Sequence, residues 1–333
     1  TAGGTAGPGR FGRLARRLPD LPVVLVVAVV AGLAARPWLQ TVRRPPSTYK
    51  EQITVEFMRA VQQVNGLPID PTRLYYENSL YWLFWYLGVP TVALAALAIA
   101  MLGRRLVRGR GFVWLLPLAI VCWTTATTLW RPSITADHPW ASRRFVPIVL
   151  GGLILLACWG LRWVRDRLRR RGHGLRAQRA ALAVGGLLIL VPPVITSIGT
   201  AFTPVERGER AAVEALCRAL PRDGSVLTVE RVTADRFTAL VRGTCGLPAA
   251  RVRLEPGAET AAAADVRRIA AAVRAAGRTP VLLAAESGQL AEYGAPVQVM
   301  SLRTRQDERS LVDPPNGTWS FSVDVWMTVP AGG

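Results

Sequence analysis

The chain has 333 residues, of which half are hydrophobic, and its formal net charge at pH 7 is +19. A charge of this size normally suggests a nucleic-acid partner. Residues 205–333, however, hold 16 arginines against 15 acidic residues, so almost all of the excess precedes them. It falls in loops between apolar segments, where arginine orients membrane helices and attracts anionic headgroups. We therefore expect a membrane lipid, and no nucleic acid, as a partner.

Five apolar segments dominate residues 21–203, and each has about the length needed to cross a hydrocarbon core of roughly 30 Å. They run over residues 21–38, 81–102, 112–130, 145–163 and 180–200. The first contains Arg36, which we expect to reach toward the membrane surface. The sequence predicts an α-helical integral membrane bundle of about five transmembrane helices, followed by a small α/β extracytoplasmic domain over residues 204–333.

The charges of the loops alternate along the chain. Arginines crowd the stretch before the first segment, residues 104–110 and residues 162–179, whereas the loops 39–80 and 131–144 mix arginines with acids. By the positive-inside rule, the basic stretches face the cytoplasm. The sequence thus predicts a multi-pass protein of the cell membrane. Its residues 1–20 form a flexible basic cytoplasmic segment, and the two mixed loops and the C-terminal domain lie outside.

The first outer loop, 39–80, contains an amphipathic helix over Tyr49–Val64 and then a run of aromatic residues from Tyr75 to Tyr86. One interpretation is an interfacial belt that anchors the second segment. The other is that the loop helix lies on the membrane surface and that Tyr76 and Glu77, with Trp140 of the next loop, form the wall of a cavity.

The second outer loop, 131–144, concentrates an acid, an imidazole and two adjacent arginines: Asp137, His138, Arg143 and Arg144. Guanidinium groups offer paired donors to phosphate oxygens, so these residues could bind an anion. The alternative is that the two arginines anchor the fourth segment at the headgroups while Asp137 pairs with one of them.

The C-terminal domain alternates helical and strand patterns. Helices are expected over residues 206–220, 234–242 and 261–276, and strands over 225–230, 251–254, 280–285, 297–302 and 319–328. This alternation predicts a mostly parallel sheet with the last strand at an edge. The domain contains none of the common glycine-rich or nucleophile motifs and no histidine, so its sequence points to no active site.

The four cysteines divide by environment. Cys122 and Cys158 lie in apolar segments, whereas Cys217 and Cys245 lie in the C-terminal domain. An extracytoplasmic setting permits a disulfide between the latter two, and the alternative is two free buried thiols. Because no paired Cys or His spacing occurs, we expect neither a metal site nor a cofactor.

Three stretches carry a resemblance to a known family: residues 72–80 (TRLYYENSL), 85–90 (WYLGVP) and 137–147 (DHPWASRRFVP). With the soluble domain after the last segment, the chain resembles the C-terminal half of an actinobacterial membrane glycosyltransferase of the GT-C superfamily, which includes protein mannosyltransferase and aminoarabinose transferase relatives. The resemblance covers about residues 40–200, and the C-terminal domain matches only in its general arrangement.

The resemblance implies an enzyme that transfers a sugar from a polyprenyl-phosphate donor to an acceptor of the cell envelope. It implies that Arg143 and Arg144 bind the donor phosphate and that Asp137 and His138 orient them. The family's catalytic acid lies in the first outer loop, often as one of a pair of acids, and no such pair occurs in 39–80. If the chain is a fragment, which we expect, the catalytic acid lies upstream; if it is complete, Glu77 or Asp70 would have to serve.

Two further functions are open at this stage. The chain could instead be a non-enzymatic membrane-anchored ectodomain that binds a cell-envelope component or a partner protein. A transporter is the weaker option, because transport usually requires ionisable residues within the membrane segments or repeat symmetry.

Overall fold

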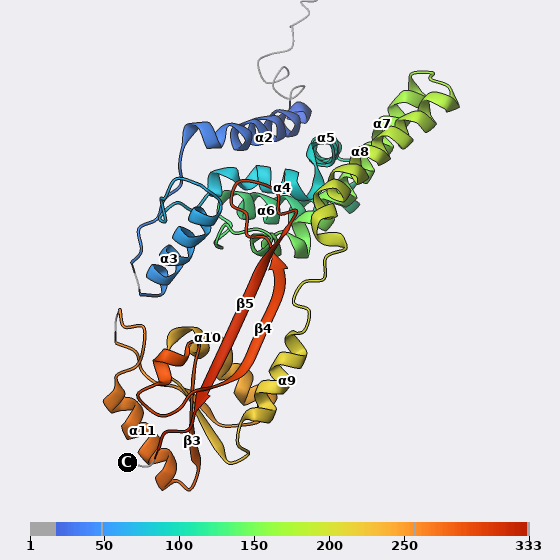
Figure 1. Cartoon of the computed structure of the whole chain (residues 1–333). Helices are drawn as coiled ribbons and strands as arrows, with labels where there is room; N and C mark the ends of the chain where they lie inside the picture. Colours follow the sequence, from blue (N-terminus) through green and yellow to red (C-terminus); the bar gives the residue numbers. More distant parts are fainter. Residues whose placement is uncertain (1–17, 48, 256, 332–333) are drawn as a thin grey trace, which may run out of the picture. The chain divides into compact units, whose positions relative to one another are not determined.

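A computed structural model describes residues 18–47, 49–255 and 257–331 (Figure 1). The chain divides into two compact units, which we describe separately. The first, here called the helical unit, comprises Thr1–Phe202 and Asp307–Gly317, and the second, the α/β unit, comprises Thr203–Gln306 and Thr318–Gly333. Most of the predicted basic segment 1–20 lies outside the described residues.

The helical unit contains seven described α-helices. They are α2 (Leu21–Leu39), α3 (Tyr49–Val64), α4 (Ser79–Leu87), α5 (Val89–Val107), α6 (Leu115–Trp130), α7 (Gly151–Arg170) and α8 (Leu175–Ala201). Short helical turns extend several of these, and five of the resulting helices are long and apolar enough to cross a membrane. These five run over Leu18–Leu39, Val89–Val107, Phe112–Trp130, Val146–Arg170 and Leu175–Ala201. The chain thus combines apolar helices of membrane-spanning length with a small mixed sheet, in agreement with the coarse fold class predicted from the sequence.

The second apolar segment differs from the prediction, because 81–102 is not one continuous helix. Gly88 separates α4 from α5 with a φ of 77°, a conformation that residues with a Cβ rarely adopt. A Cβ at Gly88 would also lie 2.5 Å from the Cβ of Pro192 in α8. Pro90, in the first turn of α5, has no amide hydrogen to donate back across the break.

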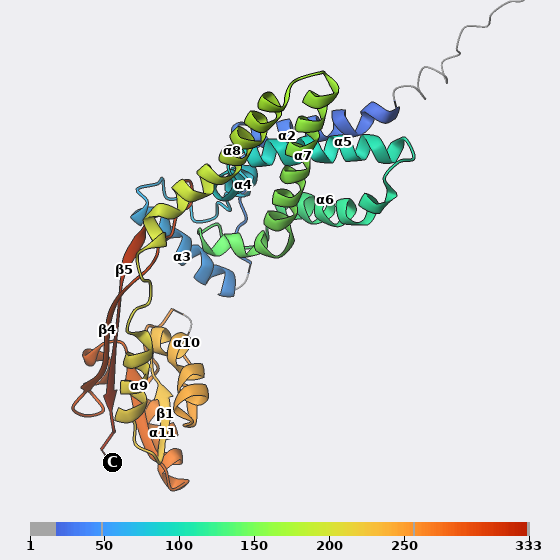
Figure 2. The same ribbon diagram turned by 90° about the vertical axis from the view of Figure 1, so that its right-hand side faces the viewer.

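Small residues allow the long helices to pack closely. Gly160 of α7 lies against the backbone oxygen of Leu94 in α5, and Gly185 of α8 lies against the side chain of Leu161, so a Cβ at either position would clash. Apolar helices in lipid gain no hydrophobic free energy by associating, so close packing at small residues such as glycine contributes much of their attraction. Helices α7 and α8 consequently lie side by side in both views (Figures 1 and 2).

Arg36 does not reach outward as predicted. Its side chain is buried, and its Nη1 donates hydrogen bonds to the backbone oxygens of Tyr76 (3.1 Å) and Leu129 (3.2 Å). The last carbonyls of a helix lack intrahelical partners, so a guanidinium at the end of α6 satisfies groups that would otherwise be unpaired.

The α/β unit is a five-stranded sheet with helices on both faces. The strands are β1 (Gly224–Thr228), β2 (Ala249–Arg251), β3 (Thr279–Ala284), β4 (Val297–Asp307) and β5 (Thr318–Thr328), and the helices are α9 (Glu209–Ala219), α10 (Arg231–Leu240) and α11 (Ala263–Ala275). The side chains alternate in the buried strands: Val281 and Leu283 pack with α9 and α10, whereas Leu282 and Ala284 pack with α11. Figure 2 shows these helices around the strands.

The strand order β2-β1-β3-β5-β4 corrects the prediction that the last strand lies at an edge. Strand β1 pairs in parallel with β2 and β3, whereas β5 pairs antiparallel with β3 and has β4 on its other side. The 11-residue strand β4 is much longer than its predicted six residues, 297–302, so it can cover the far edge of β5. The sheet is therefore mixed, with β2 and β4 at its edges.

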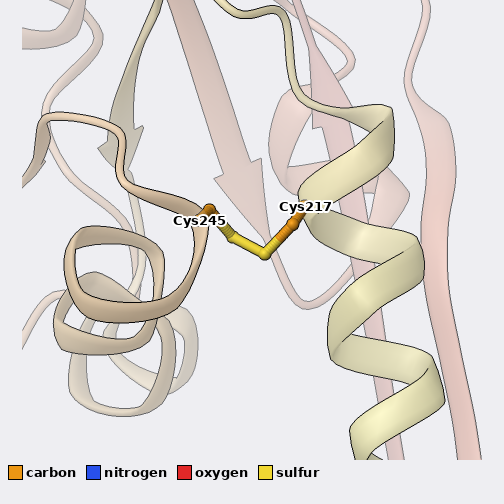
Figure 3. The surroundings of a disulfide bond; sticks show 2 residues. All are labelled: Cys217 and Cys245. Carbon is orange, nitrogen blue, oxygen red and sulfur yellow. A yellow bond between two sulfur atoms is a disulfide. The ribbon is translucent and has the colours of Figure 1, made fainter.

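A disulfide joins Cys217 in α9 to Cys245, which ends the helical turn after α10 (Figure 3). The two Cα atoms lie 5.0 Å apart, within the usual range for a disulfide. The bond ties two helices that pack on the same face of the sheet. Cys122 and Cys158 are free thiols.

The segment between β4 and β5 belongs to the helical unit, although the predicted domain 204–333 placed it with the sheet. The side chain of Leu311 in this segment is completely buried in the same apolar core as Trp82 and Phe145. Ser310 forms an antiparallel bridge with His138, with N–O distances of 2.8 and 3.0 Å. These long-range contacts are invisible in the local pattern from which the boundary was predicted.

Candidate functional site

The loop between α6 and α7 separates buried from exposed side chains. Asp137 and His138 are buried at 1% and 0% relative exposure, whereas Arg143 and Arg144 are exposed on a short helical turn over Trp140–Arg144. The four residues that the sequence suggested as one phosphate site therefore occupy two different environments.

Asp137 is paired with Arg309 of the β4–β5 segment, and its Oδ2 lies 2.6 Å from Arg309 Nη1. The backbone oxygen of Arg309 in turn accepts a hydrogen bond from the side chain of Asn65 at 2.9 Å. Burial raises the pKa of the Asp137 carboxyl, and the adjacent guanidinium opposes that rise. Asp137 is thus part of a buried ion pair that fixes the segment and does not orient Arg143 or Arg144 through that carboxylate oxygen.

His138 is enclosed by aromatic side chains of α4. Its ring centroid lies 4.7 Å from that of Trp82 and 5.0 Å from that of Trp85, both edge-on, and its Nδ1 lies 2.7 Å from the hydroxyl of Tyr86. Burial lowers the pKa of His138 to about 3, so the ring is neutral at physiological pH. This position makes His138 a packing residue and removes it from direct contact with an exposed anion.

The two exposed arginines diverge. The guanidinium of Arg143 stacks on the ring of Trp140 at 3.7 Å from its centroid, which is a cation–π contact. The Nη2 of Arg144 instead donates to the backbone oxygen of Ser133 at 3.1 Å. Arg144 therefore faces the start of the loop, where a cavity opens, while Trp140 serves as the platform for Arg143.

That cavity lies between the loop 39–80, including α3, and the start of the loop 131–144, and its volume is about 270 Å³. It is lined by Arg44, Pro45, Pro46, Thr54, Val55, Met58, Pro71, Arg73, Leu74, Tyr76, Arg131, Ser133, Ile134, Thr135 and Ala136. A lining that combines three arginines with apolar and hydroxyl side chains is suited to an anionic group attached to an apolar chain.

Tyr76 stands at the centre of this group of charges. Its hydroxyl exchanges hydrogen bonds of 3.1 Å with both the backbone oxygen and the backbone nitrogen of Ile134. Burial raises the pKa of the Tyr76 hydroxyl, while the positive charges of Arg131, Arg44 and Arg144 oppose that rise. The charge of Arg144 thus acts on the same hydroxyl as the charges of Arg44 and Arg131, which line the cavity.

Two acids of the loop 39–80, Glu77 and Asp70, are held in ion pairs away from the cavity. The side chain of Glu77 is fully buried, lies 2.8 Å from Arg73 Nη2 and accepts a hydrogen bond from the backbone nitrogen of Val42. Asp70 pairs with Arg43 at 2.6 Å. Among the described residues the cavity lining contains no carboxylate, and Glu77 supports the wall through Arg73 without facing the hollow.

The sequence did not single out Arg44 and Arg131 as site residues. Arg44 is one of several arginines in a loop that also contains acids, so it does not stand out in the sequence. Arg131 follows directly after an apolar segment, which is the usual position of a residue that anchors a helix at the headgroups. The available signal was that Arg131 ends an apolar helix on the acid-containing side of the bundle, where the positive-inside rule disfavours arginine. Within the described residues, no group of three or more His, Cys, Asp or Glu side chains could hold a metal ion.

Comparison of the chain with models of protein families, with curated proteins and with solved structures found no match.

Proposed function

We propose that this chain binds the phosphate of a polyprenyl-phosphate-linked sugar at the outer ends of its membrane helices and acts in the transfer of that sugar to a cell-envelope acceptor. The observation that supports the proposal is the cavity of about 270 Å³, whose lining combines three arginines with proline, valine, leucine, isoleucine and methionine side chains. On this proposal the protein is a multi-pass membrane glycosyltransferase, or part of one, related to the GT-C superfamily.

The chemistry of the donor fits such a cavity. The leaving group in the transfer is a lipid-linked phosphate whose negative charge grows in the transition state, and fixed cations around it stabilise that charge. Arg131, Arg44 and Arg144 supply the cations near Tyr76. Proline, valine and methionine side chains of the lining offer an apolar surface for the first units of the prenyl chain.

The contribution of the described residues in this proposal is donor binding and charge stabilisation. Their lining holds no carboxylate that could activate an acceptor hydroxyl. We accordingly assign Arg131 and Arg144 as donor-phosphate residues, with Arg44 beside them, and name no catalytic residue.

The second candidate is a membrane-anchored protein whose α/β unit binds an envelope component or a partner protein. The observation that favours it is the state of the loop acids, because Glu77 and Asp70 are both held in ion pairs with arginine. A carboxylate fixed in this way supports structure and is poorly placed to act as a base.

The experiment is a binding measurement on the full chain in phosphatidylcholine nanodiscs, with a long-chain polyprenyl phosphate as probe and the matching polyprenol as the control ligand. We expect the phosphate form to bind and the alcohol to bind far more weakly. The double variant Arg131→Gln/Arg144→Gln should weaken phosphate binding by more than about tenfold, because each lost charged hydrogen bond costs about 1.5–3 kcal/mol.

Arg143→Gln is the matched control from the same turn, since Arg143 stacks on Trp140, whereas Arg144 donates to Ser133 of the cavity lining. It should change the affinity by less than about twofold, because a substitution at a site independent of the ligand has an effect of only about 0.3–0.5 kcal/mol. Equal binding of phosphate and alcohol by the unmodified protein would reject donor binding and favour the membrane-anchored alternative.

A further inference from the structure

A second cavity lies at the opposite end of the same helices, where none of the function proposed above is placed. It is formed by the end of α5, the start of α6 and the second half of α7, and its volume is about 340 Å³. The lining consists of Arg105, Trp114, Trp159, Arg162, Trp163, Asp166, Arg167 and Arg170. We call it the Arg/Trp pocket.

The residues of α7 in this pocket form one face of the helix. Trp159, Arg162, Trp163, Asp166, Arg167 and Arg170 follow the spacing i, i+3, i+4, i+7, i+8, i+11. Leu153 and Ala157, on the neighbouring face of α7, are buried in the apolar core. The helix is thus amphipathic here, and its polar face is concave together with α5 and α6.

The aromatic side chains give the pocket an apolar base. The rings of Trp114 and Trp159 meet edge-on at 6.4 Å between centroids, and both are half-buried. Tryptophan prefers the level of the headgroups in a membrane, because its ring is apolar and its N–H group is polar. The pocket therefore lies where the apolar stretches of α5, α6 and α7 give way to arginine-rich turns.

The charges of the pocket are only partly compensated. Asp166 lies 2.7 Å from Arg165 and 3.9 Å from Arg162. Within the part of the chain that the structure describes, the side chains of the other three lining arginines, Arg105, Arg167 and Arg170, form no hydrogen bond or ion pair. Four arginines and one aspartate leave a formal charge of +3 on the lining.

We propose that the Arg/Trp pocket is a binding site for the phosphate headgroup of an anionic membrane lipid. The guanidinium groups provide paired donors for the phosphate oxygens, and the tryptophan rings contact the glycerol and upper acyl region of the lipid. Basic residues that only set topology need to lie in a loop; they do not require a hollow or a helical face shared with tryptophan.

The test measures the affinity of the full chain for cardiolipin. The purified protein is placed in phosphatidylcholine nanodiscs with and without cardiolipin, at about physiological ionic strength so that distant charges are screened. The pocket variant is Arg105→Gln/Arg167→Gln/Arg170→Gln. The control variant Arg108→Gln/Arg169→Gln/Arg171→Gln removes the same charge from the same end of the helices but from residues outside the lining.

The pocket variant should weaken cardiolipin binding by about 30-fold, whereas the control should weaken it by less than about threefold, because only the pocket arginines contact the phosphates. Arg167→Gln alone, at an exposed position, is the milder variant if the triple variant does not fold, and it should weaken binding by about threefold or more.

An equal loss in the pocket and control variants would overturn the proposal, because general attraction between the basic end and the membrane would then explain the binding. Glycerol phosphate offered at the same concentration as cardiolipin separates the two sources of the phosphate. Equal occupancy by this soluble anion would overturn a lipid site in favour of a soluble phosphate ligand, and preference for cardiolipin supports the lipid site.

Discussion

The two ends of the helical unit both combine arginine with aromatic side chains, yet they hold the charges differently. At the end that carries the loops 39–80 and 131–144, Arg309 is fixed by Asp137 and Arg73 is fixed by Glu77, and both carboxylates are buried. At the other end, three of the four arginines in the Arg/Trp pocket form no ion pair with a described residue. Burying a charge is costly unless a partner compensates it, so the paired charges at the loop end belong to the architecture. The unpaired arginines of the Arg/Trp pocket are accessible to a ligand, and at the loop end only the arginines outside these two pairs, such as Arg131, can serve a ligand.

The contrast can be tested most strongly at the Asp137–Arg309 pair. Arg309→Gln leaves Asp137 buried without its cation, and removal of one partner from a buried pair costs about 3 kcal/mol or more. We therefore expect the free energy of unfolding in detergent to fall by about 3 kcal/mol. The double variant Asp137→Asn/Arg309→Gln should regain a large part of this loss, since no uncompensated carboxylate remains.

The control for that experiment is Arg143→Gln, which removes an exposed arginine of the same unit. Its effect should stay below about 0.5 kcal/mol. If Arg309→Gln were no more harmful than Arg143→Gln, the segment between β4 and β5 would not be held by the buried pair.

The pH dependence of stability provides an intermediate effect. Burial lowers the pKa of His138 from 6.5 in the unfolded chain to about 3 in the folded protein. Between these values the unfolded chain binds a proton that the folded protein does not, so stability falls as the pH is lowered through this window. The slope contributed by His138 is at most about 1.4 kcal/mol per pH unit.

The variant His138→Gln should reduce this slope, as measured by unfolding at a series of pH values from about 6.5 downward. Asp137 acts in the opposite direction, because burial raises its pKa, and the comparison between variant and parent removes its contribution. The exposed His173, the only other histidine, supplies the matched control His173→Gln. An unchanged slope in His138→Gln would mean that the ring is accessible to protons in the folded protein.

The smallest effect is expected at the end that carries the Arg/Trp pocket. Asp166→Asn removes the carboxylate that pairs with Arg165, and surface pairs of this kind contribute little to stability. Thermal unfolding in detergent should be unchanged within error. A loss comparable with that of Arg309→Gln would show that this end is also held together by fixed charge and would erase the contrast.

Local patterns in the sequence predicted those features that depend on a few neighbouring residues. The apolar segments are long and continuous, so the helices that are long and apolar enough to cross a membrane could be predicted, although their ends differ and Gly88 divides the second one. The alternation of Val323 and Val325 with polar residues identified β5, and the same alternation said nothing about its neighbours. Its interior position depends on the pairing with β3 and β4.

The candidate site shows the same division. Composition alone indicated that the loop 131–144 is unusual, because it places an acid, a histidine and two arginines near an apolar helix. The partner of Asp137 is 172 residues away in the chain, and no spacing rule connects the two. The convergence of Arg131, Arg44 and Arg144 near Tyr76 likewise joins residues of two separate loops.

The sequence by itself determined the apolar helices, the strands and the concentration of arginine at particular loops, because hydrophobic length and periodicity are local properties of the chain. Only the tertiary structure decided which charges are paired and buried and which remain open to a ligand. That decision depends on desolvation and on distances between residues far apart in sequence, so Asp137 and His138 became packing residues while Arg131 and Arg167 line cavities.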